Sequence, residues 1–132
     1  MTTLNSLNQQ FGIAGHLQFI EVDGGLTFAE ISNAHATASI AIQGAHIATF
    51  QPKGEEPVIW LSKLAKFIPG KSIRGGVPVC WPWFGPHATD SKLPGHGYAR
   101  TVMWEVQETK ALADGSTFIR FGLIENETTK AQ

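Results

Sequence analysis

Two of the chain's three arginines stand beside glycines in one stretch, residues 72–100, where they could bind an anion. Arg74 is followed by Gly75-Gly76, and Arg100 follows Gly95-His96-Gly97. A guanidinium group offers a planar fork of donors that matches a phosphate or a carboxylate, and it stays charged at physiological pH. Glycine lets a backbone approach a ligand where a Cβ would clash. Both arginines are therefore candidate anion ligands; the alternative for each is a surface pair with a glutamate.

His96 is the candidate acid–base group of the same stretch. Imidazole titrates near neutral pH, so a histidine between two glycines could transfer a proton or donate a hydrogen bond. The alternative is a turn histidine bonded to the backbone. The other four histidines lack partners at the spacing of metal ligands, so we expect no metal site. They are His16, His35, His46 and His87. No P-loop, GxSxG elbow or dinucleotide fingerprint is present in the sequence, and we expect no cofactor.

Three aromatic residues in the stretch have two alternative roles. Trp81, Trp83 and Phe84 offer flat apolar faces that can stack on the C–H side of a sugar ring. The same side chains can fill the core of a β-sandwich, which is the commoner role for any one of them. Cys80 stands in an apolar run, and we expect an inert buried thiol there.

Length and composition exclude several classes of protein. The chain has 132 residues, of which 42% are hydrophobic and 16% charged, and its formal net charge is −1. These values are typical of a globular domain. The balanced charge argues against nucleic acid as a partner, and the single cysteine excludes a disulfide framework. No apolar run is long enough to span a membrane, and the first residues do not resemble a signal peptide, so we expect a cytoplasmic protein.

The sequence predicts that these residues are positioned by short β-strands, which are separated by turn signals. The runs cover residues 17–22, 26–32, 36–42, 44–50, 57–61, 101–107 and 116–123. Asp23-Gly24-Gly25 predicts a hairpin between the first two. Residues 5–10 could form a helical turn, and no longer stretch has helical periodicity. The pattern predicts an all-β fold, a sandwich or a barrel.

The middle third of the chain differs from the thirds on either side. All seven prolines lie between residues 52 and 94. Proline lacks an amide donor and fixes φ, so this region is expected to consist of loops and short edge segments. We read residues 1–132 as a single domain that ends in a polar tail at residues 125–132.

Two long blocks of the sequence resemble the glucose-6-phosphate 1-epimerases (hexose-6-phosphate mutarotases). The first is IRGGVPVCWPWFG at residues 73–85; the second is LPGHGYAR at residues 93–100, followed by Trp104. Residues 44–52 and 57–62 resemble an N-terminal hairpin of the same family. These enzymes belong to the aldose 1-epimerase, or galactose mutarotase-like, superfamily. The resemblance runs from about residue 17 to residue 123.

This resemblance implies an antiparallel β-sandwich that interconverts the α and β anomers of a hexose 6-phosphate. Arg74 and Arg100 match arginines that hold the phosphate, and His96 matches a histidine in the sugar pocket. Gly95 stands where relatives often carry a polar substrate contact. Mutarotation needs one group to protonate the ring oxygen and another to deprotonate the anomeric hydroxyl. In the family a histidine and a glutamate of the second half do this, and nothing in this chain matches them, so His96 would be an auxiliary group at best.

The resemblance therefore predicts about half of the family's sandwich, the half that binds phosphate. The favoured hypothesis is an enzyme of mutarotase descent that is inactive or weak as an isolated chain. The alternatives are a sugar-phosphate-binding module without turnover and a structural scaffold. Half a sandwich would expose apolar faces and strand edges, so we expect a homo-oligomer, a two-fold dimer.

Overall fold

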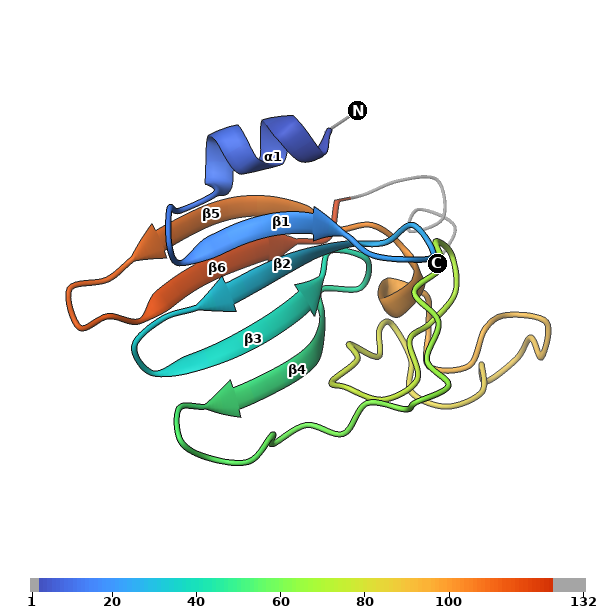
Figure 1. Cartoon of the computed structure of the whole chain (residues 1–132). Coiled ribbons are helices and arrows are strands. Elements are labelled where there is room, and N and C mark those ends of the chain that lie inside the picture. The colour runs from blue at the N-terminus through green and yellow to red at the C-terminus, as the bar shows by residue number, and fades with distance from the viewer. Residues whose placement is uncertain (1–2, 125–132) are drawn as a thin grey trace.

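A computed structural model of the chain describes residues 3–124, so the polar tail at residues 125–132 lies outside the described residues. The described part contains one α-helix, six strands and a short 3-10 helix (Figure 1). In chain order they are α1 (Leu4–Phe11), β1 (Leu17–Glu21), β2 (Thr27–Ser32), β3 (Ala36–Ala41), β4 (His46–Pro52), η1 (Ala99–Thr101), β5 (Glu105–Ala111) and β6 (Thr117–Gly122). All strand pairs are antiparallel, in one sheet of order β1-β2-β3-β4 and a second sheet, β5-β6.

Local hairpins build the four-stranded sheet. The hairpin predicted at Asp23-Gly24-Gly25 joins β1 to β2, with Phe19 opposite Ala29 and Ile20 opposite Phe28. Side chains alternate between the faces of a strand, so these two neighbouring pairs point to opposite sides of the sheet. Both faces of the sheet can therefore carry a hydrophobic core.

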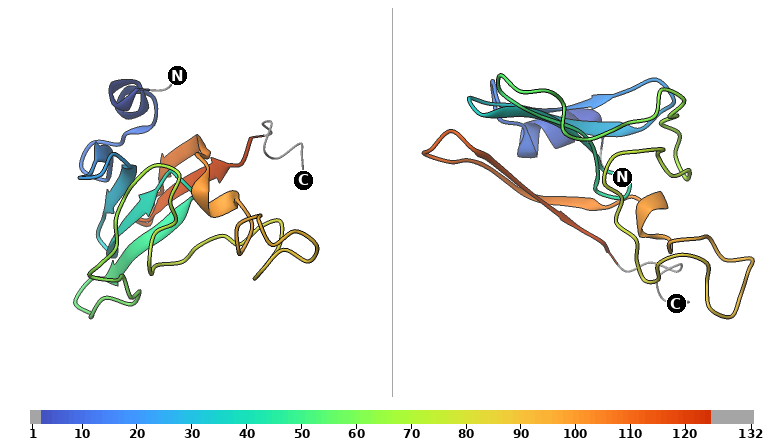
Figure 2. Two further views of the ribbon diagram at one scale, coloured as in Figure 1. Left: turned by 90° about the vertical axis from the view of Figure 1, so that its right-hand side faces the viewer. Right: turned by 90° about the horizontal axis from the view of Figure 1, so that it is seen from below.

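The β5–β6 hairpin covers one of these faces as a second layer (Figure 2, right). Phe19 and Ala29 of the sheet share a core with Val106 of β5, and Ile119 and Phe121 of β6 pack against it. The predicted all-β, antiparallel sandwich is confirmed. Strand β5 begins later than the run at 101–107 suggested, because the chain first turns through η1.

The proline-rich residues 53–98 form neither a helix nor a strand (Figure 1, green to orange), and part of this segment packs on the opposite face of the sheet. Ile73 belongs to the core on this side together with Phe28 and Ala41, and Phe67 packs edge-on against Phe28. The apolar run at 57–61 makes only an isolated bridge, between Leu61 and Gly75. Loops in this region were predicted from proline, and the structure agrees.

Helix α1 is longer than the helical turn suggested by the sequence. Its N-terminus has a capping box, in which the Thr3 hydroxyl accepts from the Ser6 amide and the Ser6 hydroxyl accepts from the Thr3 amide. The Asn8 side chain then pairs with the outer edge of β1, donating to the Phe19 carbonyl at 2.9 Å and accepting from the Phe19 amide at 2.7 Å. The helix thus occupies an edge that could otherwise pair with another chain.

No described residue pairs with the outer edge of β6. Such an edge, with Phe118 half exposed beside it, is a template for strand pairing. The two-fold dimer stays a prediction: light scattering should give the mass of two chains, and a monomer at high concentration would contradict it.

Candidate anion site

Arg74 is held from both sides through its backbone and the two glycines that follow it. The Arg74 carbonyl accepts from the Ser62 amide at 3.1 Å, and the Gly76 amide donates to the Trp60 carbonyl at 2.7 Å. Gly75 and Gly76 have φ values of +98° and +73°, a region that favours glycine. The turn therefore has a fixed backbone, while the Arg74 side chain is exposed.

His46, the first residue of β4, contacts this turn and was not predicted to have a role at the site. Its ring is fully buried, and Nε2 donates to the Gly75 carbonyl at 2.7 Å. A Cβ on Gly76 would lie 2.6 Å from the same nitrogen. Burial lowers the pKa of His46; the Gly75 hydrogen bond opposes this, and the positive charge of Arg100 lowers the pKa further. The lowered pKa favours the neutral ring, which donates to the turn through Nε2.

Arg100 lies in η1, which packs against the turn between β3 and β4. A Cβ on Gly44 would lie 2.8 Å from the Arg100 carbonyl oxygen, and the Gly44 amide donates to the Val102 carbonyl at 2.8 Å. The Arg100 side chain donates from Nη2 to the Gly95 carbonyl at 3.0 Å, and its buried Nε has no partner among the described residues. In this arginine cluster, Gly44 packs against the backbone of Arg100 and His46 bonds to the turn after Arg74.

His96 is joined to the same cluster by its neighbour Gly95. It adopts a left-handed backbone conformation, with φ +64°, and pairs with Gly85. The His96 amide donates to the Gly85 carbonyl at 2.8 Å, and Nδ1 accepts from the Gly85 amide at 3.0 Å. This is the turn histidine bonded to the backbone that was one of the two interpretations. In the neutral ring the proton lies on Nε2, which can donate to a ligand.

The three aromatic residues differ in their contacts, and Trp81 is both packed against a ring and 49% exposed. Trp81 and Trp83 meet the buried Tyr98 edge-on, at centroid distances of 5.8 and 6.1 Å. Phe84 is 80% exposed and lies 4.7 Å from the His96 ring, so it is the aromatic face nearest that histidine that remains open to a ligand. The free Cys80 is half-buried, less so than expected from its apolar neighbours.

The third arginine gives a contrast within the same molecule. Arg120, on β6, contacts Glu108 at 3.0 Å, and Lys110 contacts the same carboxylate at 2.9 Å. Hydrogen bonding from Lys110 and both positive charges lower the pKa of Glu108. Neither Arg74 nor Arg100 forms an ion pair within residues 3–124. The pairing with a glutamate, which was the alternative for Arg74 and Arg100, is found within the described residues at Arg120 instead.

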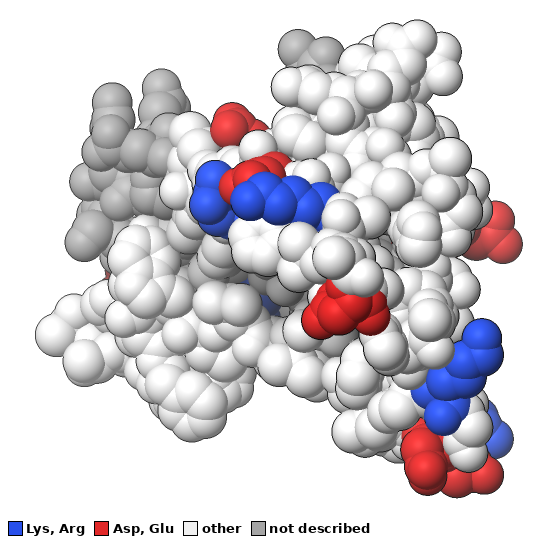
Figure 3. Space-filling view, turned by 90° about the vertical axis from the view of Figure 1, so that its left-hand side faces the viewer, with Lys and Arg blue, Asp and Glu red and all other residues white. Residues whose placement is uncertain are grey.

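Figure 3 shows a face on which charged side chains form small groups on a largely uncharged surface. Within the described residues, no group of three or more His, Cys, Asp or Glu side chains could hold a metal ion. The one α-helix of this part is too short and too polar to cross a membrane.

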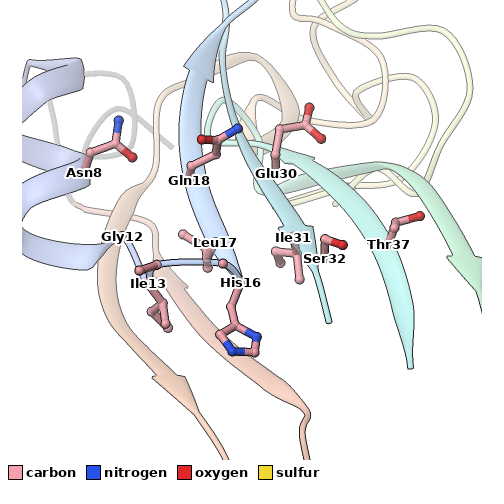
Figure 4. Close-up of a pocket in the computed structure, with 12 residues that line it drawn as sticks. Asn8, Gly12, Ile13, His16, Leu17, Gln18, Glu30, Ile31, Ser32 and Thr37 are labelled. Carbon is pink, nitrogen blue, oxygen red and sulfur yellow. The ribbon is translucent and has the colours of Figure 1, made fainter. Parts of the chain in front are cut away.

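An open groove of about 580 Å³ lies elsewhere, at the end of the sheet nearest α1 (Figure 4). Gln18, Glu30 and Thr37 point to one side of the sheet there, and His16 points to the other. Burial raises the pKa of Glu30. None of the groove's lining residues belongs to the arginine cluster. It is a separate surface.

Comparison with known proteins agrees with this fold. The profile of the aldose 1-epimerase family matches residues 28–129. An Escherichia coli protein named "Putative glucose-6-phosphate 1-epimerase" is 47% identical over 100 residues, which are 76% of this chain and 33% of that protein. A Salmonella typhimurium protein of the same name is 42% identical over the same shares. The crystal structure of a "putative mutarotase" from Salmonella typhimurium superposes with a TM-score of 0.84 at 37% identity, covering 92% of this chain and 40% of that one.

The chain belongs to the aldose 1-epimerase family. It spans about a third of the length of the curated relatives it matches. The epimerase and mutarotase resemblance found in the sequence is thus confirmed.

Proposed function

We propose that this chain supplies the phosphate-binding part of a hexose-6-phosphate 1-epimerase site. The observation that carries this proposal is the contrast among the arginines: Arg74 and Arg100 lie in one cluster without a carboxylate partner, whereas Arg120 is paired. A guanidinium held by buried backbone contacts and left unpaired is ready to bind a dianionic phosphate. The names of the relatives add a sugar 6-phosphate as the substrate class.

In this proposal His96 binds the sugar and does not carry the proton transfers alone. Its Nε2 proton can reach a sugar hydroxyl, and the exposed Phe84 ring beside it can stack on the C–H face of the sugar. No described carboxylate forms an ion pair with His96. We propose that the pair that opens and closes the ring comes from outside this chain.

Titration with glucose 6-phosphate, followed by amide chemical shifts, tests the binding proposal. Arg74→Ala and Arg100→Ala should each weaken binding about 10- to 100-fold, because a hydrogen bond to a charged group contributes about 1.5–3 kcal/mol. Arg120→Ala is the matched control and should bind like the unmodified chain. Equal affinity in all three variants would contradict the site.

Saturation-transfer NMR on the α and β anomers of glucose 6-phosphate tests the catalytic part. The chain alone should not accelerate exchange beyond buffer, although it binds the sugar phosphate. Acceleration that Arg74→Ala abolishes would show that the acid–base pair lies within the chain. Binding without exchange would also fit the sugar-phosphate-binding module. If the chain shows neither binding nor exchange, the structural scaffold is the hypothesis that is left.

A further inference from the structure

The turn between β3 and β4 contacts two segments: the chain that leads into Arg74 and the backbone of Arg100. Gln43 is 2% exposed; its Oε1 accepts from the Gly70 amide and its Nε2 donates to the Lys71 carbonyl, both at 2.8 Å. These contacts fix the chain that leads into Arg74. The next residue, Gly44, packs directly against the backbone of Arg100. One short turn of the regular sheet thus anchors both arginine segments.

His46 follows this turn as the first residue of β4, and its side chain contacts the glycines after Arg74. Its Nε2 donates to the Gly75 carbonyl, and its ring is in van der Waals contact with Gly76. The positive charge of Arg100 lowers the pKa of the ring. The next contact runs in the opposite direction: the Val77 amide donates to the Ile47 carbonyl of β4 at 2.8 Å. The imidazole therefore fills the space that separates the glycine turn from the sheet.

We propose that His46 is a positioning residue for the sugar phosphate: it holds the Arg74 turn at a fixed place relative to Arg100, so that both guanidinium groups reach one phosphate. This inference rests on the proposed function and names a residue that touches neither the phosphate nor the sugar. The Gly75 carbonyl lies in a half-buried turn, and His46 is the side chain that donates to it. Without that donor, we expect the turn to shift so that water satisfies the carbonyl.

Three substitutions in the full chain separate a positioning role from a purely structural one. His46→Gln keeps a donor near the position of Nε2, and His46→Leu keeps the volume but removes the donor. His16→Leu is the matched control, because His16 is half-buried and lines the groove remote from the arginines. Circular dichroism and thermal unfolding establish that each variant is folded before glucose 6-phosphate is titrated.

We expect His46→Gln to bind glucose 6-phosphate within about threefold of the unmodified chain and His46→Leu to bind about tenfold more weakly while still folded. Amide shifts of Gly75 and Gly76 should move in His46→Leu and stay near their original values in His46→Gln. Binding by folded His46→Leu equal to that of the unmodified chain would overturn the inference. If His46→Leu does not fold, equal tenfold losses in His46→Gln and in a His46→Asn variant would overturn it, because rescue by the longer amide is then absent. Failure of the unmodified chain to bind would instead overturn the proposed function.

Discussion

The four-stranded sheet and residues 53–98 are two regions of one molecule that are ordered in different ways. In strands β1–β4, backbone groups pair with a neighbouring strand in a regular register. In residues 53–98, which contain seven of the chain's 14 glycines, backbone groups pair with loop carbonyls, with side chains or with the end of the sheet. The sheet is thus held by regular strand pairing, whereas residues 53–98, the site region, are held by individual contacts. Substitution of an exposed side chain in the site region should therefore affect function at little cost in stability, whereas substitution of a buried side chain in the sheet should do the reverse.

The largest expected difference in the free energy of unfolding is between substitutions of two phenylalanines. Phe19 is 2% exposed in the core between the sheets, whereas Phe84 is 80% exposed in the site region. Phe19→Ala should lower the free energy of unfolding by about 3–5 kcal/mol, because it leaves a cavity. Phe84→Ala should change it by less than about 0.5 kcal/mol, as exposed positions do. Urea denaturation measures both, and similar costs would contradict the comparison.

The next prediction compares two glycines of residues 53–98 that have similar backbone angles. Gly76 has φ +73° and Gly54 has φ +79°, so alanine is strained at both. A Cβ at Gly76 would meet His46 and the Ile47 carbonyl, while at Gly54 nothing lies within 4 Å. Gly54→Ala should cost about 1–2 kcal/mol, the strain alone. Gly76→Ala should cost about 1–3 kcal/mol more and should also abolish sugar-phosphate binding. Equal stabilities and unchanged binding would show that the turn does not rest on His46.

A smaller effect is expected at the edge of the sheet. Asn8→Ala removes both hydrogen bonds to Phe19 and leaves the edge of β1 open. We expect a loss of about 1–2 kcal/mol in the free energy of unfolding, because each net hydrogen bond contributes about 0.5–1.5 kcal/mol. Asn5→Ala is the control on the same helix, since Asn5 is exposed, and it should be neutral. Equal stability of the two variants would contradict the claim that Asn8 of α1 stabilises the edge of β1.

The smallest effect concerns pH. The pKa of His46 is lowered in the folded chain, mainly by burial, so the unfolded chain binds the proton more readily. Stability from this group is fully present above the unfolded pKa, about 6.5, and is lost as the pH falls toward the folded value. The unmodified chain should therefore lose more stability between pH 7.5 and about pH 5 than His46→Gln does. The raised pKa of Glu30 acts in the opposite direction in both proteins, so it cancels in the difference. Identical pH profiles would contradict a buried neutral His46.

Much of the fold could be predicted from the sequence because its signals are local. Alternation and the turn at Asp23-Gly24-Gly25 gave the strands of the sheet and the first hairpin, and prolines marked the loop region. Helix α1 was underpredicted because its end and its place depend on Asn8 reaching a strand eleven residues away. The start of β5 was misplaced because η1 forms by packing against the turn at Gly44.

The candidate site was predictable in its residue types and unpredictable in its assembly. Arg74, Arg100 and His96 stood out by their glycine neighbours and by the family resemblance. His46 did not, because nothing in the sequence places residue 46 under the carbonyl of residue 75. The signal that could have found it was Gly76: a left-handed glycine pair beside an arginine needs a partner that approaches closely, and a buried histidine can supply it.

The central claim, that Arg74 and Arg100 bind one phosphate, is tested most directly by a double-mutant cycle on glucose 6-phosphate affinity. The cycle combines Arg74→Ala with Arg100→Ala and repeats the pairing of Arg74→Ala with Arg120→Ala as a reference. Two groups that hold one ligand should show a coupling energy of at least about 0.5 kcal/mol, and the reference pair should be additive. Additive losses in both cycles, or no effect of either arginine, would contradict the claim.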